Sequence, residues 1–365
     1  MEYKSLTPPA ATGGTITTTA THRIHTFTSS ETFTSYKSMN IEVLVVAGGG
    51  GGSQSGGGAG GLIYNSSFAV SPQSYPVTVG NGGAAGFHTA DDGQNSVFSI
   101  ITAIGGAGGV EGNAGNVNGK NGGSGSGASC NQTEASCSGT GGTGTSGQGN
   151  AGGSINGSRT SGGGGGAGAA SAGAESNYAS AGGIGISYNI SGTATYYSGG
   201  GGGGARGGGG INSGGGAGGL GGGGSGGSGN PRVVPTAGSV NTGGGGGGDW
   251  GSTPGAGGSG IVIIRYSLTE DITSANIEAI SMTVDPPSES PCRAGICTVG
   301  VSVTWKNTGG TSGSSDLSIT VSGGTPTITP SAYSSISFAV NEEKTLTFTV
   351  LDMIAGTHSI CPNPN

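Results

Sequence analysis

Ile41-Glu-Val-Leu-Val-Val46 runs directly into Ala47 and five glycines, and Ile261-Val-Ile-Ile-Arg-Tyr266 ends the glycine-rich block that begins there. Both stretches are continuous and rich in β-branched residues, as expected for strands that are buried on both faces. We predict that they pair with each other across more than two hundred residues of chain. Such a pairing would tie the two ends of the block together, which a disordered spacer does not need.

The block between these stretches cannot build an ordinary core of side chains, because 80 of the chain's 90 glycines lie between positions 41 and 260. The apolar fraction of the chain is 31%, below the roughly 45–50% of a typical globular protein. Only 8% of the residues are charged, which argues against a highly charged disordered chain. The block is therefore either disordered or held together by its backbone.

Glycine runs recur at irregular spacing, and the lack of a Gly-X-Y repeat with proline excludes collagen. An extended helix of three residues per turn rises about 3.1 Å per residue and has no internal hydrogen bonds. Glycine helices of this kind, called polyglycine II, can pack laterally and pair N–H with C=O groups of their neighbours. That pairing must offset the large entropy that glycine loses on ordering. The runs are 48–52, 56–61, 162–166, 199–204, 207–210, 214–224 and 243–248.

These patterns predict an all-β fold with a polyglycine II lattice. Residues 1–13 are expected to form a linker. Residues 14–266 are expected to form the glycine-rich domain, with a β-layer over 14–105, a polyglycine core over 106–260 and a closing strand over 261–266. Alternating residues on both sides of Ser29-Ser30-Glu31 predict a hairpin there. Apolar islands predict further strands over 62–70, 75–79 and 96–104.

The composition changes after Tyr266, and residues 275–365 are expected to form a separate domain. Short strands separated by turn residues in about 90 positions are typical of an immunoglobulin-like β-sandwich. The expected strands are Ile277–Val284, Cys297–Trp305, Leu317–Val321, Ile336–Val340, Lys344–Val350 and His358–Cys361.

Five cysteines and four Asn-x-Ser/Thr sequons suggest an extracellular protein. Cys130 and Cys137 enclose six residues, and a disulfide there would close that loop. We favour a second bridge from Cys292 or Cys297 to Cys361. The N-terminus lacks a signal peptide, and no apolar run of about 18 residues predicts a membrane span. A virion component released by lysis fits both observations. The candidate glycosylation sites are Asn65, Asn131, Asn156 and Asn189.

No pattern in the sequence predicts an enzyme, a cofactor or a metal site. Gly-x-Gly-x-x-Gly occurs repeatedly, but a dinucleotide site also requires a strand, a turn and a helix, and helical periodicity is absent. His22 and His25 lack a nearby third ligand, so we assign them packing or surface roles. With a net charge of −7 the chain has no basic face for nucleic acid.

The turns between glycine runs hold most of the large polar and aromatic side chains of the second half of the block. These side chains have two possible roles: they could cap the ends of the lattice, or they could anchor a receptor. The candidate receptor-binding residues are Asn177, Tyr178, Tyr188, Tyr196, Tyr197, Arg232 and Trp250.

Four motifs resemble those of a glycine-rich domain found in phage and archaeal-virus tail proteins and in some microbial surface proteins. Together the matching stretches cover positions 14–266. The overall plan is also similar to the adhesins of T-even phage tail fibres, in which packed polyglycine II helices display variable loops. The C-terminal part resembles adhesion modules of the CARDB type. The motifs are Thr21-His-Arg-Ile-His-Thr-Phe-Thr-Ser-Ser-Glu-Thr-Phe-Thr34 followed by the strand at Ile41, Gly57-Gly-Ala-Gly-Gly-Leu-Ile63, Tyr75-Pro-Val-Thr-Val-Gly-Asn-Gly-Gly83 and Gly258-Ser-Gly-Ile-Val-Ile-Ile-Arg-Tyr266.

This resemblance implies a non-enzymatic host-recognition protein on the virion surface, such as a tail fibre, spike or adhesin. Its partners would be a glycan or protein receptor on the host cell and other virion subunits. Tail appendages of this kind are usually trimers, so a homotrimer is favoured. The alternative is a structural subunit of an extracellular filament or sheath. A strand donated from Thr15–Thr34 to a neighbouring subunit would favour the filament.

Overall fold

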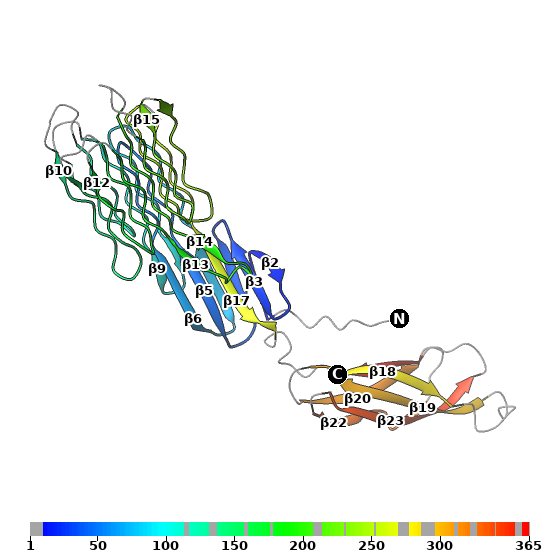
Figure 1. Ribbon diagram of the computed structural model, residues 1–365. Coiled ribbons are helices and arrows are strands. Elements are labelled where there is room, and N and C mark those ends of the chain that lie inside the picture. Colours follow the sequence, from blue (N-terminus) through cyan, green and yellow to red (C-terminus); the bar gives the residue numbers. More distant parts are fainter. Residues whose placement is uncertain are drawn as a thin grey trace. The chain divides into compact units, whose positions relative to one another are not determined.

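A computed structural model describes residues 10–112, 117–130, 137–156, 160–175, 178–206, 214–229, 231–251, 253–268, 277–285, 296–309, 313–321, 327–339, 341–354 and 360–364. The chain divides into a glycine-rich unit over 11–266 and a second unit that contains 267–365 (Figure 1). The fold is all-β, with several antiparallel sheets. Among the described residues there is no helix with the length and apolar character needed to cross a membrane.

The two strands that enclose the glycine block pair as predicted. β5 (Met39–Val46) and β17 (Ile261–Ser267) are antiparallel, with Ile261 opposite Val46 and Arg265 opposite Glu42. They lie at the centre of a five-stranded sheet, between β3 (His22–Phe27) and β6 (Leu62–Val70), with β2 (Thr15–Thr18) at one edge. Leu44, Val46 and Ile263 face one side of this sheet and are buried there.

A polar cluster reinforces the pairing of the first and last strands. Arg265 donates hydrogen bonds to both carboxylate oxygens of Glu42, at 2.9 and 2.6 Å. The Tyr64 hydroxyl donates to the same carboxylate at 2.5 Å. Burial acts to raise the pKa of Glu42, but the hydrogen bonds from Arg265 and Tyr64 outweigh it and lower the pKa below 4.5. Burial, together with the hydrogen bond to Glu42, raises the pKa of Tyr64 to about 12.

The second sheet packs on the first through aromatic rings. Its order is β1 (Ala11–Thr12), β4 (Glu31–Ser35), β7 (Gln73–Thr78), β8 (Ser96–Phe98) and β9 (Ile101–Ala103). Phe98 lies 6.0 Å from Phe33 within this sheet and 5.5 Å from Phe68 of β6. The hairpin predicted at Ser29–Glu31 is therefore wrong. The chain does turn there, but β3 and β4 belong to different sheets, because the turn carries it from one layer to the next.

The glycine segments bond to one another with a period of three residues. Along 47–52, N–H groups three positions apart donate to the same neighbouring segment, over 2.8 to 3.0 Å. Three segments accept these bonds, and three others donate to the carbonyls of 48–52, so six segments surround this one. The donor pairs are Ala47 to Gly61 with Gly50 to Gly58, Gly48 to Gln94 with Gly51 to Asp91, and Gly49 to Gly258 with Gly52 to Gly255.

Glycine is required in these segments because their backbones lie very close together. A Cβ added at Gly50 would overlap the carbonyl of Ala107, and one added at Gly201 would overlap that of Gly246. The described glycines with positive φ are Gly13, Gly14, Gly147, Gly192, Gly221, Gly222 and Gly243. They lie at turns and segment ends, so space rather than φ excludes side chains from the interior of the runs.

Interior and peripheral segments differ in sequence. The interior segments are buried throughout and consist mostly of Gly, Ala and Ser; they are 47–52, 56–62, 105–112, 123–130, 160–166, 198–205 and 243–249. Peripheral segments carry X-Gly-Gly triplets instead, with X exposed, as in Ala181-Gly-Gly-Ile184 and Thr140-Gly-Gly-Thr143. Every third position of such a segment faces solvent, so only that position accepts a side chain.

One edge of the glycine-rich part is closed by asparagine side chains. Asn118 and Asn121 are three residues apart, and their Oδ1 atoms accept from the N–H groups of Thr140 and Thr143 at 2.9 and 2.8 Å. Asp92 and Asn95 do the same for Gly108 and Gly105. These side chains replace the carbonyls that another segment would supply.

The remaining short strands lie at the two ends of the glycine segments (Figure 1). At one end are β10 (Ser138–Gly139), β11 (Ile155–Asn156) and β12 (Ala174–Glu175), together with the pair β15 (Ser228–Gly229) and β16 (Arg232–Val233). At the other end the hairpin of β13 (Ile186–Tyr188) and β14 (Thr195–Tyr197) adds Ile190 and Tyr197 to the buried cluster of the first sheet. Glycine segments 47–61 and 79–95 connect to the strands that precede and follow them, so the glycine-rich part includes chain before residue 106.

The C-terminal unit has two sheets around a side-chain core. One has the order β18 (Ile277–Val284), β19 (Ile296–Asn307), β23 (Glu343–Ile354) and β21 (Thr327–Thr329). The other has the order β22 (Tyr333–Phe338), β20 (Gly313–Val321) and β24 (Ile360–Pro364). Alternate residues of these strands, among them Trp305, Leu317 and Phe348, form one buried cluster. A strand overlaps each predicted range, although residues 340, 358 and 359 of the predicted strands lie outside the described residues, and β21 is an addition.

Candidate functional site

The glycine segments connect two ends of different character. We call the end with β2, β3, β5, β6, β13, β14 and β17 the strand end, and the end with β10, β12 and β15 the loop end (Figure 1). Side chains at the strand end fill the cores of the two sheets. At the loop end, polar side chains hold the turns in place, and this end is the candidate functional site.

A buried turn at Ser53-Gln54-Ser55 lies at the centre of the loop end. Gln54 is fully buried and uses both ends of its amide. Its Nε2 donates to Glu111 Oε1 at 3.0 Å, and its Oε1 accepts from Ser129 Oγ at 2.9 Å and from the Gly112 N–H at 3.1 Å. Glu111 Oε2 also forms a hydrogen bond with Nδ1 of the exposed His88. This network joins the turn at 53–55 to the chain at His88, at 111–112 and at Ser129.

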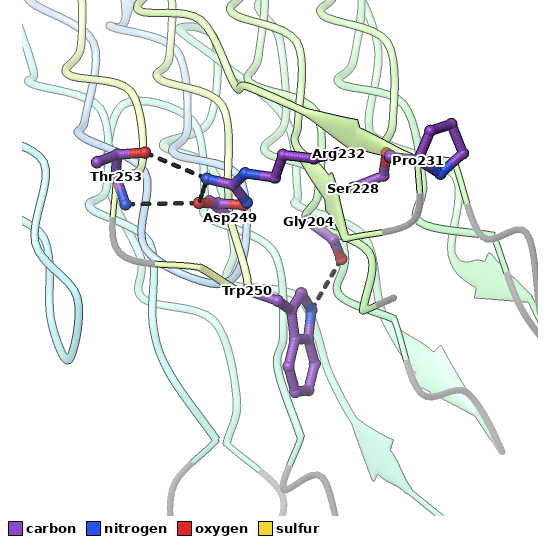
Figure 2. A network of polar contacts seen from close by, with 7 residues as sticks. All are labelled: Gly204, Ser228, Pro231, Arg232, Asp249, Trp250 and Thr253. Atoms are coloured by element: carbon purple, nitrogen blue, oxygen red, sulfur yellow. Dashed lines mark hydrogen bonds and ion pairs between the residues drawn. The ribbon is translucent and has the colours of Figure 1, made fainter. Parts of the chain in front are cut away.

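A second network fixes the turn after the last interior glycine run (Figure 2). Arg232 donates from Nη1 and Nη2 to the two carboxylate oxygens of Asp249, at 2.9 and 3.0 Å. The Asp249 side chain is 1% exposed and that of Arg232 is 44% exposed. The hydrogen bonds to Asp249, followed by its charge, raise the pKa of Arg232. Bidentate pairing of this kind fixes the relative orientation of the guanidinium and carboxylate planes in addition to the attraction between their charges.

Backbone contacts extend this network to the neighbouring segments. The Trp250 indole N–H donates to the Gly204 carbonyl at 2.9 Å, and Ser228 Oγ donates to the Pro231 carbonyl at 2.8 Å (Figure 2). The Asp249 N–H donates to the Ser53 carbonyl at 2.7 Å, which links this network to the central turn. The loop end is therefore organised by specific polar contacts.

Exposed side chains lie above these contacts. Tyr178 is 67% exposed and follows β12, and its carbonyl accepts from Thr160 Oγ1 at 2.9 Å. Thr160 bridges to Ala205, and Ala205 to Ser228 of β15. Val233 and Val234, beyond β15, are also exposed. Backbone pairs thus connect Thr160, through Ala205 and β15, with the strand that carries Arg232, and the hydrogen bond from Thr160 Oγ1 joins the Tyr178 carbonyl to this row.

The structure joins Cys130 and Cys137 by a disulfide at the loop end. Both cysteines are buried beside Ala128, Ile155 and Ala174 in a small apolar cluster beneath β10 to β12. The bridge fixes the two ends of the intervening loop to the glycine segments.

Three candidate tyrosines lie at the strand end, away from the loop end. Tyr188 packs against Tyr64 with the two rings tilted and their centroids 4.7 Å apart, and burial raises the pKa of Tyr188. Tyr197 is buried in the core of the first sheet, and Tyr196 is exposed. The structure therefore groups Tyr178, Arg232 and Trp250, and separates them from the other tyrosines. Tyr188 and Tyr197 have packing roles.

The other candidates are distributed as follows. Asn177, Asn131 and Cys292 lie outside the described residues, as does the glycine run 207–210. Cys297 and Cys361 are described by their backbones only, in β19 and β24. Asn65 is half-buried in β6, whereas Asn156 and Asn189 are exposed. His25 is buried against Phe33 and Tyr266, and its Nδ1 donates to the Gly13 carbonyl at 2.8 Å. Within the described ranges no group of three His, Cys, Asp or Glu side chains could hold a metal ion.

Gln54, Glu111 and Asp249 were not predicted as site residues. Each is a single large polar residue at or near the end of a Gly, Ala or Ser segment. Because an interior segment has no room for such a residue, its presence there marks a turn with a buried polar contact. This signal could have identified all three.

The comparisons with known proteins identify a family for the glycine-rich part of the chain. No curated protein and no solved structure matches the sequence. Residues 26–267, more than half of the 365-residue chain, match a family described as a glycine-rich domain. The match ends at the last residue of β17 and therefore includes the closing strand. The chain belongs to this glycine-rich domain family.

Proposed function

We propose that this chain is a non-enzymatic host-recognition protein of a virion, such as a tail fibre, spike or adhesin. Its glycine-rich unit would be a rigid scaffold, and its loop end would bind a glycan or protein receptor on the host cell. In this proposal the protein acts at the virion surface, outside the cell.

The scaffold in this proposal is a polyglycine II lattice. The three-residue period of hydrogen bonding along 47–52 supports it, because each residue of a three-fold helix faces a different neighbour. The same period occurs along 199–205, where Gly199, Gly202 and Ala205 donate to Gly221, Gly224 and Gly227. The six neighbours of the central segment fit hexagonal packing of such helices.

The observation that carries the proposal is the difference between the two ends of this scaffold. Turns at the loop end are held by Gln54, by the Arg232–Asp249 pair and by the disulfide, while Tyr178 and Val234 remain exposed above them. A rigid display of small and aromatic residues lowers the ordering cost of binding. We therefore assign receptor binding to Tyr178, Arg232, Val233, Val234 and Trp250.

The C-terminal unit would be an immunoglobulin-like module of the CARDB type. The two antiparallel sheets and the single apolar cluster between them support this assignment. The module would attach the scaffold to another virion subunit or add a second contact with the host.

The filament alternative receives less support. It requires a donated strand, and Thr15–Thr34 was the expected donor. In the structure β2 pairs with β3, and β4 pairs with β1 and β7, all within the same chain. This segment is therefore already used in its own fold, which favours the adhesin.

Hydrogen exchange of the intact protein tests the scaffold. We expect strong protection of amides in 160–166, 198–205 and 243–249, because their N–H groups bond to neighbouring segments. Fast exchange through all of these runs would contradict a rigid lattice and leave a flexible linker between two β-units.

Binding of the labelled full chain to cells and isolated envelopes of candidate hosts tests the recognition role. The variants Tyr178→Ala and Val234→Ser should each weaken saturable binding about tenfold or more, as expected for anchor residues. Tyr196→Ala is the matched control, since it removes another exposed tyrosine ring, at the strand end. Equal losses for Tyr178→Ala and Tyr196→Ala would contradict assignment of the site to the loop end.

A further inference from the structure

The two sheets of the C-terminal unit end in four strands, β18, β21, β22 and β24. Short length, prolines, lysines and irregular backbone are the usual features that protect a sheet edge from further pairing. β21 has three residues, β24 contains two prolines, and β22 includes Ser335 with a φ of 53°. β18 has eight residues with neither proline nor lysine, and its register with β19 is regular over 281–284. This part of β18 is therefore the least protected sheet edge among the described strands of the unit.

Apolar side chains at this edge are exposed although they face the core side of their sheet. Residues that lie opposite each other on paired strands share a face of the sheet. Met282 lies opposite Val303 and Val284 lies opposite Val301, and both partners are 0% exposed. Met282 is nevertheless 38% exposed and Val284 is 49% exposed. The second sheet therefore covers the middle of the first sheet but leaves the core-facing side of β18 partly open.

We propose that this open edge, residues 281–284, accepts a β-strand from another virion subunit. The inference rests on the attachment role proposed above for the C-terminal unit. The added strand pairs its backbone with the side of β18 that faces no other described strand, and it lays alternate apolar side chains beside Met282 and Val284. Strand addition of this kind draws affinity from main-chain hydrogen bonds and specificity from the alternate side chains.

The charge of the unit indicates the chemistry of the partner. Residues 267–365 contain nine Asp and Glu but three Lys and Arg, so their net charge is −6, against −7 for the whole chain. Asp285, directly after the open edge, is exposed. A basic strand is therefore the complementary partner, since opposite charge steers association and suppresses wrong partners. The lysines described in this unit each pair with a glutamate, over 3.0 and 3.4 Å: Lys306 with Glu343 and Lys344 with Glu342.

The same charge argues against a second copy of this chain at the open edge. Pairing β18 with β18 of another copy would bring together two units that each carry a net charge of −6, and like charges oppose such association. A strand with lysine or arginine between its apolar residues meets both requirements, because its side chains alternate between two faces. Its apolar face covers Met282 and Val284, while its basic face lies toward solvent beside the acidic unit.

Binding of labelled peptides to the full-length protein, measured by fluorescence anisotropy, tests the inference. The lysine peptide alternates valine and lysine over about ten residues, the upper length of a common strand, and its control alternates valine and glutamate. We expect saturable binding of the lysine peptide, at least tenfold tighter than that of the glutamate peptide. Two further lysine peptides are N-methylated, one at the valines and the other at the lysines. One of them should bind at least tenfold more weakly than the other, because only one set of amides faces β18.

The double variant Met282→Ser with Val284→Ser should bind the lysine peptide at least tenfold more weakly, since it removes both apolar contacts. Thr283→Ser is the matched control, because Thr283 lies on the same edge but on the opposite face of the sheet. It should bind the lysine peptide like the unmodified chain.

The inference is overturned if the lysine peptide does not bind, if the glutamate peptide binds equally well, or if the double variant binds as tightly as Thr283→Ser. Self-association of the unmodified chain that the double variant loses would make a second copy the occupant and would also overturn it. Should the double variant fail to fold, the two N-methylated peptides decide with the unmodified chain, and equal affinities overturn the inference. Failure of the recognition role is distinguishable, since Tyr178→Ala should bind the lysine peptide normally while it loses binding to cells.

Discussion

The two units of this protein are stabilised in different ways, one by a core of side chains and the other by hydrogen bonds between backbones. The C-terminal unit buries Trp305, Phe338 and Phe348 between two sheets, and its stability comes from apolar side-chain area removed from water. The interior of the glycine-rich unit has almost no side chains to bury, and its segments are joined by backbone hydrogen bonds. The comparison shows that an interior almost without side chains can be stable, provided that its backbone N–H groups are hydrogen-bonded to carbonyls.

The largest expected effect is that of a single methyl group in the glycine interior. In Gly201→Ala the new Cβ would lie 2.6 Å from the carbonyl carbon of Gly246. Because this carbon belongs to the backbone of a buried segment, it cannot rotate away as a side chain could. We expect a cost of about 4 kcal/mol or more, above the usual range for overpacking. Calorimetry should show the transition of the glycine-rich unit lost or strongly lowered, with that of the C-terminal unit unchanged.

Gly214→Ala is the control for this variant, because a Cβ at Gly214 meets nothing within 4 Å. Its unfolding temperature should match that of the unmodified protein. Equal tolerance of Gly201→Ala and Gly214→Ala would show that close backbone packing does not hold the unit together.

The reverse test removes atoms from the C-terminal core. Phe348→Ala should cost about 3–5 kcal/mol, as is usual when a buried aromatic ring is deleted. The loss should be confined to the transition of the C-terminal unit. A similar drop in the transition of the glycine-rich unit would mean that the two units do not unfold independently.

A third test concerns the polar cluster that reinforces β5 and β17. The folded pKa of Glu42 is lowered, so its stabilisation is present above about pH 4.5 and is lost as the pH falls through the folded value. We expect Glu42→Gln to cost about 2 kcal/mol at neutral pH and to flatten the acid side of the stability profile. An unchanged acid profile would contradict this role.

The same cluster also loses stability at high pH, because Tyr64 ionises there. The pKa of Tyr64 is raised from 10 to about 12, so its contribution is complete below pH 10 and is lost between these values. Tyr64→Phe should remove that alkaline loss. Chemical denaturation of the glycine-rich unit at pH 9 and pH 11 measures it.

The smallest effect is expected at the capped edge. Asn121→Ala removes the acceptor for the Thr143 N–H and should cost about 1 kcal/mol, with faster exchange of that amide. Asn121→Asp keeps a carboxylate oxygen in its place and should preserve the protection. Loss of protection in both variants would indicate that the amide group of Asn121, and not its oxygen, matters.

The sequence was sufficient for the parts of the fold that follow from local pattern. Runs of β-branched residues predicted the pairing of β5 with β17, and alternation predicted the strands of the C-terminal unit. The pairing partner of β4 was not predictable, because the turn at 29–31 is compatible with either sheet. The burial of Tyr197 was not predictable either, since it depends on how the β13–β14 hairpin packs on the first sheet.

In the candidate site, too, some features follow from local sequence pattern and others depend on contacts between distant residues. The loops were recognisable because residues with large side chains follow the ends of the glycine runs. Their assignment to one end or the other depends on the direction of each segment, and that is set by contacts between residues such as Asp249 and Ser53, far apart in the chain. X-Gly-Gly triplets do carry this information in part, because they distinguish peripheral segments from interior ones.

The closing strand also determines the order in which the protein can assemble. Segment 47–52 is made early in synthesis, yet it bonds to 246 and 255–258, and β5 must wait for β17. Most contacts of the glycine-rich unit are therefore distant in sequence, which makes folding slow. A ribosome adding about 5–20 residues per second needs at least ten seconds to deliver β17 after β5. During that interval the nascent chain has no complete glycine interior, so its first segments, almost free of apolar side chains, must stay soluble on their own.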